Sequence, residues 1–241
     1  MIKIKNVSKS FGTKLALKNI NLEIADGETL AIIGGSGSGK STLLRLMIGL
    51  IKPSEGEIWI DNDEISQMDE EEITQVRLKM GMVFQYSALF DSMTVGDNVA
   101  FGLVEHTNLN KDEISKIVRD KLKQVGLEGV ENLMPSELSG GMKKRVSLAR
   151  AIAFGPKIIF YDEPSSGLDP VTTNKIDDLI ISTQRALKVT SVVVTHDMVS
   201  ACRIADRIAM VYNGELIAVD TVDNFKNIND TRVREFFRVV D

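Results

Sequence analysis

A run of eight residues rich in glycine carries the strongest chemical signal in the sequence. It reads Gly34-Gly35-Ser36-Gly37-Ser38-Gly39-Lys40-Ser41, which fits the pattern G-x-x-x-x-G-K-[ST] at every position. Glycines let the backbone wrap a phosphate with its N–H groups pointing inward, and a following helix N-terminus adds partial positive charge. Lys40 is then placed to reach the β- and γ-phosphates, and the Ser41 hydroxyl to ligate Mg²⁺. A flexible Gly/Ser linker is the plain alternative, which the Lys-Ser ending and the flanking elements disfavour.

Two adjacent acids form the second chemical signal. Asp162 and Glu163 follow the apolar run 158–161, which predicts a buried strand that delivers both carboxylates at its carboxyl end, where ligands bind in open α/β sheets. Asp162 suits the surroundings of a Mg²⁺ ion, and Glu163 suits the polarisation of an attacking water. Ordinary surface acids at a strand end are the alternative, which the upstream phosphate loop makes less attractive.

A second glycine-rich helix start lies at Leu138-Ser139-Gly140-Gly141-Met142. Ser139 is a favourable N-cap, and the glycine pair leaves backbone N–H groups bare, so that this helix start is also suited to an anion. A capped helix with no ligand is the alternative, in which Lys143, Lys144 and Arg145 form only the solvated face.

These residues need a framework of strands and helices to bring them together. Short apolar runs at 29–33, 158–161 and 191–195 alternate with helical patterns at 40–50, 171–187 and 198–205. Strands that alternate with helices predict an α/β fold with a parallel sheet. The stretch from about 87 to 154 has helical spacing and reads as a helical insertion, and Asn213-Gly214 predicts a hairpin between 207–212 and 215–219.

Composition excludes several classes of protein. The chain has 241 residues with 29 basic and 34 acidic side chains, a net charge of −5, which disfavours sequence-independent nucleic-acid binding. One cysteine, Cys202, excludes an intrachain disulfide, and two histidines leave little for a transition-metal site. No apolar run approaches a membrane span, and no signal peptide opens the chain. We therefore expect a soluble, cytoplasmic protein.

Taken together, the phosphate loop, Leu138–Met142 and Asp162-Glu163 resemble the ATP-binding subunit of ABC transporters over nearly the whole chain. The resemblance implies further roles for Gln85, which contacts Mg²⁺ and water, for Asp169 of the D-loop Ser166–Asp169, and for His196 as the switch histidine. Phe11 resembles the aromatic residue that stacks on adenine, with a core position as the alternative. Catalytic residues are then Glu163, His196, Gln85 and Asp169; metal ligands are Ser41, Gln85 and Asp162. The nucleotide-binding set is Phe11, Gly34, Gly35, Ser36, Gly37, Ser38, Gly39, Lys40, Ser41, Thr42, Ser139, Gly140 and Gly141.

The same resemblance implies the architecture, a P-loop NTPase of the ABC type with a parallel-sheet core, an antiparallel β subdomain and a helical subdomain. The core and β subdomain are expected at about 1–86 and 155–220, the helical subdomain at about 87–154 and a tail helix at about 221–241. In this family ATP binds with Mg²⁺ between two chains, because Ser139–Gly141 of one completes the phosphate loop of the other. Met142 departs from the usual glutamine, Gly35 from a frequent proline and Phe11 from a commoner tyrosine.

A narrower resemblance links the chain to the ATPases of Mce-associated phospholipid transporters. It rests on the stretches 86–95 and 97–101, on 134–137, on the signature that ends in Met142 and on 151–153. It implies a homodimer bound peripherally to an integral permease at the cytoplasmic face of the inner membrane, with an Mce-domain substrate-binding protein and in some cases a small STAS-type subunit.

Several alternatives stay open at this point. A soluble ABC ATPase of the iron–sulfur-assembly type and the ATPase of another ABC importer fit the same motifs. A GTPase is a further alternative, because the pattern N-K-x-D that reads guanine is matched by Asn174-Lys175-Ile176-Asp177. This segment lies inside an expected helix, so we interpret the match as chance. Val233, Phe236, Phe237 and Val240 predict an amphipathic tail helix that packs either on its own domain or on a partner.

Overall fold

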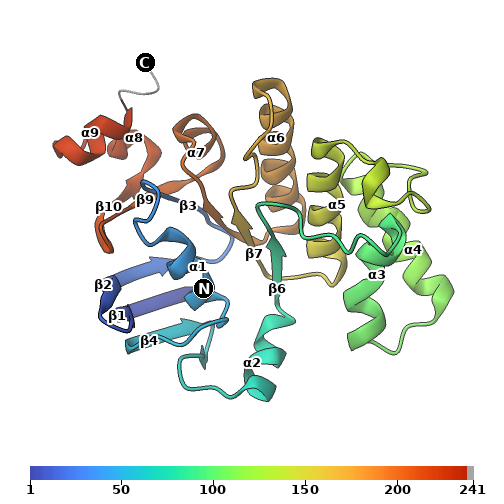
Figure 1. The fold of residues 1–241 in the computed structure, drawn as a ribbon, viewed down its shortest axis with the longest axis horizontal. Helices are drawn as coiled ribbons and strands as arrows, with labels where there is room; N and C mark the ends of the chain where they lie inside the picture. The colour runs from blue at the N-terminus through green and yellow to red at the C-terminus, as the bar shows by residue number, and fades with distance from the viewer. Residues whose placement is uncertain (238–241) are drawn as a thin grey trace.

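Apolar runs along short strands build a six-stranded sheet through the centre of the molecule (Figure 1). The computed structural model describes residues 1–237. The strand order is β10-β9-β3-β8-β7-β6, and all neighbours are parallel except the final hairpin of β9 and β10. The strands span Met80–Val83 (β6), Ile158–Asp162 (β7), Thr190–Val194 (β8), Thr29–Ile33 (β3), Arg207–Tyr212 (β9) and Glu215–Thr221 (β10).

Both faces of this sheet are covered, because successive side chains of a strand point to opposite sides. In β7, Ile158 and Phe160 join the cluster around α1 (Lys40–Met47), whereas Ile159 and Tyr161 join the cluster around α5 (Gly140–Ala153) and α6 (Pro170–Leu187). All four side chains are at most 2% exposed. The continuous apolar run of this strand therefore arises from burial on two sides.

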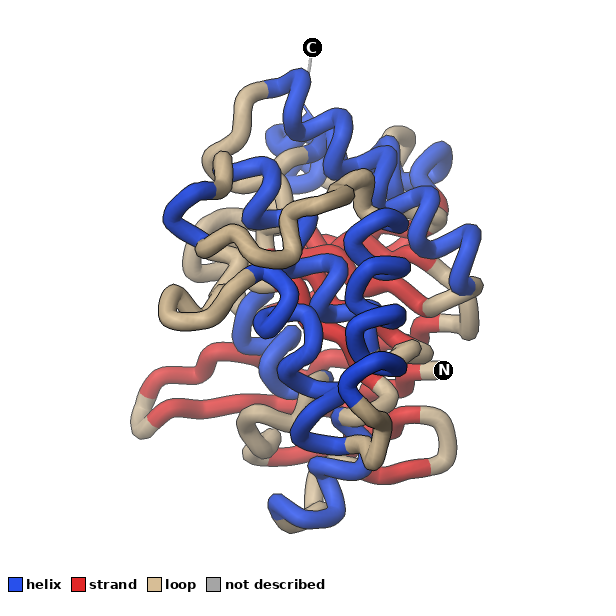
Figure 2. Tube along the Cα trace, turned by 90° about the vertical axis from the view of Figure 1, so that its right-hand side faces the viewer, coloured by secondary structure: helices blue, strands red, loops and turns tan. Residues whose placement is uncertain are grey.

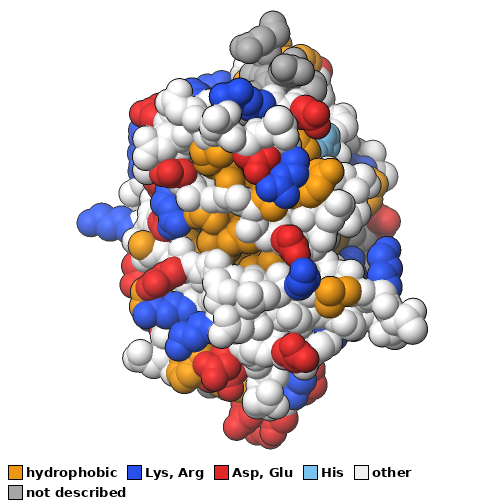
Figure 3. All heavy atoms as spheres, turned by 90° about the vertical axis from the view of Figure 1, so that its left-hand side faces the viewer, with side chains coloured by type: hydrophobic (Ala, Val, Ile, Leu, Met, Phe, Trp, Pro, Cys, Tyr) orange, Lys and Arg blue, Asp and Glu red, His pale blue; other side chains and the backbone are white. Residues whose placement is uncertain are grey.

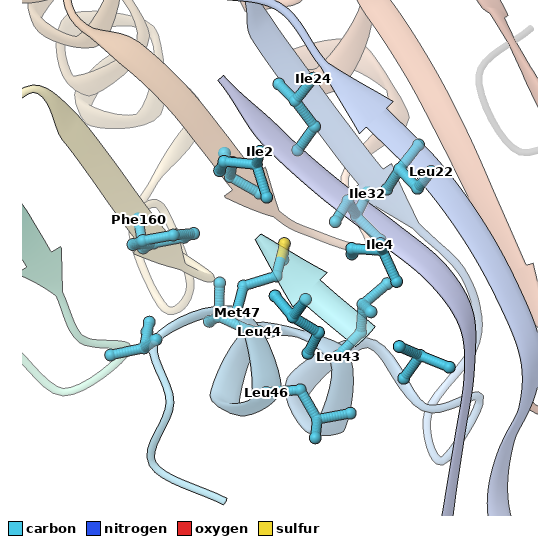
Figure 4. Packing of buried hydrophobic residues seen from close by; sticks show 14 of the residues in the cluster. Ile2, Ile4, Leu22, Ile24, Ile32, Leu43, Leu44, Leu46, Met47 and Phe160 are labelled. Carbon is cyan, nitrogen blue, oxygen red and sulfur yellow. The ribbon is translucent and has the colours of Figure 1, made fainter. Parts of the chain in front are cut away.

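A second, antiparallel sheet lies against the other side of α1. Its order is β2-β1-β4-β5, with strands at Lys14–Ile24 (β2), Ile2–Phe11 (β1), Glu55–Ile60 (β4) and Asp63–Glu64 (β5). Figure 4 shows how Ile2, Ile4, Leu43 and Leu44 meet between this sheet, α1 and the central strands. The helix that follows the phosphate loop is thus held between two sheets.

Three helices stand together beside the β6 end of the central sheet (Figures 1 and 2). They are α3 (Val95–His106), α4 (Lys111–Gln124) and α5, with a short 3-10 turn at Pro135–Glu137 before α5. The fully buried Asn98 joins this group to the loop after β6: its side-chain amide donates to the carbonyl of Thr94 at 2.9 Å and accepts from the Phe90 N–H at 2.8 Å. Asn98 therefore anchors the α3 end of the loop that carries Gln85.

The C-terminal part adds α7 (Met198–Ile204), α8 (Val222–Phe225) and α9 (Thr231–Phe237). Val233 of α9 is 1% exposed and belongs to a cluster with Ile208 and Met210 of β9, so this end of the tail helix packs on its own chain. Val240 lies outside the described residues. In Figure 3, hydrophobic side chains gather in a hollow of the face near β2 and β10, and the inner residues of β10 are half-buried. No helix among residues 1–237 has the length and apolarity to cross a membrane.

The structure corrects one expected boundary. The helix predicted over 40–50 ends at Met47, because Gly49 adopts a left-handed backbone with φ of 73° and a Cβ there would stand 2.7 Å from the Ile73 side chain. Strand β4 begins at Glu55, and glycine at position 56 lets the backbone of β1 approach closely. Helix α2 (Glu70–Arg77), capped by Asp69, was not predicted.

Candidate functional site

The phosphate loop connects β3 to α1 and leaves the start of α1 without a side-chain cap. Gly39 stands at the N-cap with φ of 116°, and a Cβ there would lie 2.6 Å from Leu17 Cδ2, so that only glycine fits. The Lys40 ammonium donates to the carbonyls of Gly34 at 2.7 Å and Gly35 at 3.0 Å. Burial lowers the pKa of Lys40, against the opposing effect of the Glu163 and Asp162 carboxylates. The loop therefore presents bare amide N–H groups beside a buried cation.

A cavity of about 510 Å³ opens beside this loop. It is lined by Phe11 and by residues of the phosphate loop and its helix, from Gly37 to Thr42, with the hairpin residues Asn213 and Gly214 on another side. Phe11 is 49% exposed, so its ring belongs to the cavity wall and not to the core. The Ser38 hydroxyl is buried and has no hydrogen-bond partner among the described residues. This polar, cationic cavity next to an aromatic ring fits a nucleotide with a phosphate chain.

Asp162 and Glu163 stand at the carboxyl end of β7, and their surroundings differ. Burial and the Glu163 charge raise the pKa of Asp162, while Arg45 and Lys40 oppose that rise. Glu163 adopts a left-handed backbone with φ of 48°, and its N–H donates to the Val194 carbonyl at 2.9 Å. Its carboxylate oxygen Oε2 lies 2.8 Å from His196 Nδ1. Tertiary packing thus pairs two predicted site residues that are 33 positions apart.

The predicted metal ligands offer only oxygen donors, the set that Mg²⁺ prefers. They are the Ser41 hydroxyl at the start of α1, the Asp162 carboxylate and the Gln85 side chain. Among residues 1–237 no three His, Cys, Asp or Glu side chains cluster as a metal cage. Such a sparse set fits Mg²⁺, which commonly binds through one or two carboxylates together with substrate phosphates. In this structure the Gln85 amide donates to the Ser166 hydroxyl at 3.3 Å, which connects its loop to the D-loop.

The remaining predicted residues lie apart from the cavity. Asp169 caps α6 by accepting from the Val171 and Thr172 N–H groups, each at 3.0 Å, and from the Thr172 hydroxyl. Ser139 caps α5 by accepting from the Met142 N–H at 3.3 Å. Ser139 and Gly140 are exposed, and neither these two nor Gly141 lines the phosphate-loop cavity of their own chain.

Sequence reasoning missed two cations on α5. Lys144 was placed on the solvated face as one alternative, but its residue is only 6% exposed, and its ammonium donates to the main-chain carbonyl of Gln85. Leu148 and Ala151 follow it at i+4 and i+7, a spacing that could have placed Lys144 on a buried stripe. Arg150 likewise donates to the carbonyls of Ser87 at 2.9 Å and Ala88 at 2.6 Å.

The parallel sheet, the phosphate loop and the acids at the end of β7 define a P-loop nucleoside-triphosphate hydrolase. Residues 17–166 match the sequence profile described as ABC transporter. The chain belongs to the ABC transporter family and is an ATP-binding, ATP-hydrolysing subunit. The predicted family and fold class are therefore confirmed.

Relatives match over nearly the full chain. The intermembrane phospholipid transport system ATP-binding protein MlaF of Haemophilus influenzae is 42% identical, with 99% of this chain and 90% of that protein covered. The methionine import ATP-binding protein MetN of Carboxydothermus hydrogenoformans is 43% identical, with 100% and 72% covered. A dimeric ATP-binding cassette in a post-hydrolysis state with ADP and Pi superposes with a TM-score of 0.85 at 39% identity, covering 92% of this chain and 99% of that one.

Proposed function

We propose that this chain is the ATPase subunit of a phospholipid transporter, in which two copies bind ATP between them and drive a membrane permease. The similarity to MlaF over almost the whole chain supports the cargo class. The Glu163–His196 pair at 2.8 Å, beside the phosphate loop, is the observation that carries the hydrolytic mechanism. The permease would hold the subunit at the cytoplasmic face of the inner membrane, with an Mce-domain protein and a small STAS-type subunit as further partners.

Nucleotide binding follows from the cavity. The backbone N–H groups of residues 34–41 surround the phosphates, Lys40 turns from the loop carbonyls to the terminal phosphates, and Phe11 stacks on the base. Ser41, Gln85 and Asp162 would hold Mg²⁺, which supplies charge neutralisation at the β- and γ-phosphate oxygens when bound.

Hydrolysis uses Glu163 as the general base. Its carboxylate accepts a proton from the attacking water, and the His196 ring fixes the position of that carboxylate. Burial and the Glu163 charge raise the pKa of Asp162, and the cations Arg45, Lys40 and Lys144 oppose that rise. We assign Glu163 to the water because its carboxylate pairs with His196, and Asp162 to the metal because it offers a carboxylate beside the cations Lys40 and Arg45.

Dimerisation completes the site. Ser139 and Gly140 are exposed at the start of α5, and Gly141 beside them is half-buried. None of the three lines the phosphate-loop cavity of its own chain, so we infer that they bind the terminal phosphate of ATP held by a second copy. The D-loop residue Asp169 would stand at the same interface. ATP then joins two helix N-termini, and its hydrolysis removes the bridging charge.

A surface for the permease lies beyond Gln85. Tyr86 is 87% exposed and Val104 is 58% exposed. Phe90 is 42% exposed and packs at a tilt against Phe101, with ring centroids 4.8 Å apart. Exposed apolar side chains in one region commonly mark a protein interface. Because Gln85 adjoins this surface, docking there would affect the hydrolytic site directly.

The experiment that tests the mechanism is the substitution Glu163→Gln. We expect turnover to fall by about a hundred-fold or more, in line with the loss of a general base, while ATP binding persists and a closed dimer accumulates. Steady-state hydrolysis and size-exclusion chromatography with ATP measure the two effects. Turnover near the unsubstituted value would show that Glu163 is not the base.

The cargo needs a separate test, because the similarity to MetN supports an amino-acid importer as the second candidate. The subunit would be purified with its membrane permease and reconstituted into liposomes. ATP-dependent movement of a labelled phospholipid supports the proposed function; ATP-dependent uptake of methionine with no lipid movement supports the alternative. Recovery of an active ATPase with no permease would instead favour a soluble ABC ATPase of the iron–sulfur-assembly type.

A further inference from the structure

Two cationic side chains of helix α5 contact the loop that follows β6. The ammonium of Lys144 donates to the main-chain carbonyl of Gln85 and lies 3.5 Å from the main-chain carbonyl oxygen of Glu163. Six residues further along the helix, Arg150 donates to the carbonyls of Ser87 and Ala88. One helix therefore fastens both the loop of Gln85 and the peptide that carries Glu163.

The backbone at these contacts is strained and needs such support. Glu163 has φ of 48°, Ser87 has φ of 62° and Ala88 has φ of 45°, all in the left-handed region that L-residues rarely adopt. Strained conformations persist only where the surroundings determine them. For Glu163 the N–H is held by the Val194 carbonyl on β8 at 2.9 Å, and the carbonyl oxygen is approached by Lys144.

A buried lysine in a helix interior also needs a reason. Lys144 is 6% exposed, and removing an ammonium from water is unfavourable unless partners compensate. Burial lowers the pKa of Lys144, whereas the nearby Glu163 and Asp162 carboxylates raise it. Its hydrogen-bond partners are main-chain oxygens of two different loops, so its contacts constrain backbone position.

We propose that Lys144 is a positioning residue for ATP hydrolysis: it ties the peptide of Gln85 to the peptide of Glu163, so that the glutamine side chain and the carboxylate keep one relative geometry. The inference rests on the proposed role of Glu163 as the base. Because Ser139 caps the same helix five residues earlier, a shift of α5 caused by a phosphate at its N-terminus would move both carbonyls together.

The first test replaces the ammonium by an apolar side chain of similar length. Lys144→Met should lower kcat about ten-fold or more and change the Kd for ATP less than about two-fold, since misplaced catalytic groups cost rate and leave phosphate binding intact. Lys116→Met, at an exposed lysine of the neighbouring helix α4, is the matched control and should leave both constants unchanged. A Lys144→Met enzyme with the unsubstituted kcat would overturn the proposal.

A double-mutant cycle separates positioning from general loss of structure. In single-turnover assays, adding Lys144→Met to the Glu163→Gln variant should lower the residual rate less than about two-fold, because no base remains to be placed. Equal losses in both backgrounds would show that Lys144 acts independently of Glu163 and overturn the inference. If Lys144→Met loses ATP binding, the same cycle is run with Lys144→Gln, which keeps an N–H donor, under the same two criteria.

The two proposals fail in distinguishable ways. A loss of turnover in Glu163→Gln together with normal turnover in Lys144→Met contradicts only the positioning role. Near-normal turnover in Glu163→Gln contradicts the base itself.

Discussion

Two helices of this protein, α1 and α5, start at glycine-rich segments, and their N-termini differ. The start of α1 has no side-chain cap, carries the buried Lys40 and borders a cavity of about 510 Å³. The start of α5 is capped by Ser139, its first residue Gly140 is exposed, and neither residue lines the phosphate-loop cavity. The first helix start therefore borders a ligand cavity within its own chain. The second does not line that cavity, in keeping with our proposal that it meets a nucleotide held by another chain.

The starts of α6 and α7 show how a helix N-terminus is satisfied when its own cap residue, and not a ligand, binds the backbone N–H groups. Asp169 and Asp197 cap them, and each carboxylate accepts from two backbone N–H groups. A carboxylate cap satisfies the amides and opposes a second anion. The start of α1 differs from both because no side chain occupies its cap, which leaves its backbone N–H groups available to a phosphate.

The largest expected effect comes from placing a side chain at the cap of α1. In Gly39→Ala, the Cβ would stand 2.6 Å from Leu17 Cδ2 and 3.0 Å from the Ala16 carbonyl oxygen, on a backbone with φ of 116°. We expect ATP binding to weaken about thirty- to a hundred-fold, because strain of about 2 to 3 kcal/mol displaces the loop. Equilibrium titration with a fluorescent ATP analogue measures the effect; binding within a factor of two would contradict the comparison.

The matched change on α5 is Gly140→Ala, which the fold tolerates. Its Cβ would make an ordinary contact with Leu168 Cδ2 at 3.6 Å on a backbone that is not left-handed. ATP binding by the isolated chain should stay unchanged, while turnover should fall about ten-fold because the methyl group obstructs a phosphate bound by the second chain. Measurement of Kd and kcat on one preparation decides the matter, and an unchanged kcat would remove Gly140 from the shared site.

The smallest expected effect is a change in stability at the contact between the two Asp-capped helices, α6 and α7. Asp177 of α6 is 1% exposed and accepts from the Ser200 hydroxyl of α7 at 2.8 Å, and burial raises its pKa to about 6. The folded state therefore binds more protons than the unfolded state between about pH 4 and 6, and stability falls as pH rises through that window. Asp177→Asn should stabilise the fold by about 1 to 2 kcal/mol at pH 7.5 and by nothing near pH 4.

Urea unfolding at the two pH values measures this difference. Asp178→Asn, at an exposed neighbour on the same helix, serves as the control, and its effect should show no comparable rise with pH. Equal effects of Asp177→Asn at both pH values would show that the buried carboxylate is not the titrating group. The ATPase rate should stay unchanged in both variants, because neither side chain lines the phosphate-loop cavity.

Much of the fold was accessible from pattern alone. The strand runs at 29–33 and 158–161 are buried on both faces, and continuous apolar runs between glycines and acids signal that environment. Helix α2 was not predicted because it is short and charged: it has eight residues, starts with Glu70 to Glu72, and buries only Ile73 and Val76, which is too little to produce a clear apolar period. The early end of α1 was missed because it depends on the close approach of Ile73 to Gly49.

The sequence by itself determined the phosphate loop, the family and the order of strands and helices, because these depend on neighbouring residues whose geometry the chain imposes directly. Only the tertiary structure decided that Lys144 is buried, that Gln85 meets Ser166, and that His196 pairs with Glu163. These contacts join residues 19 to 81 positions apart. The way in which helices and strands pack sets such contacts, and no local pattern records that packing.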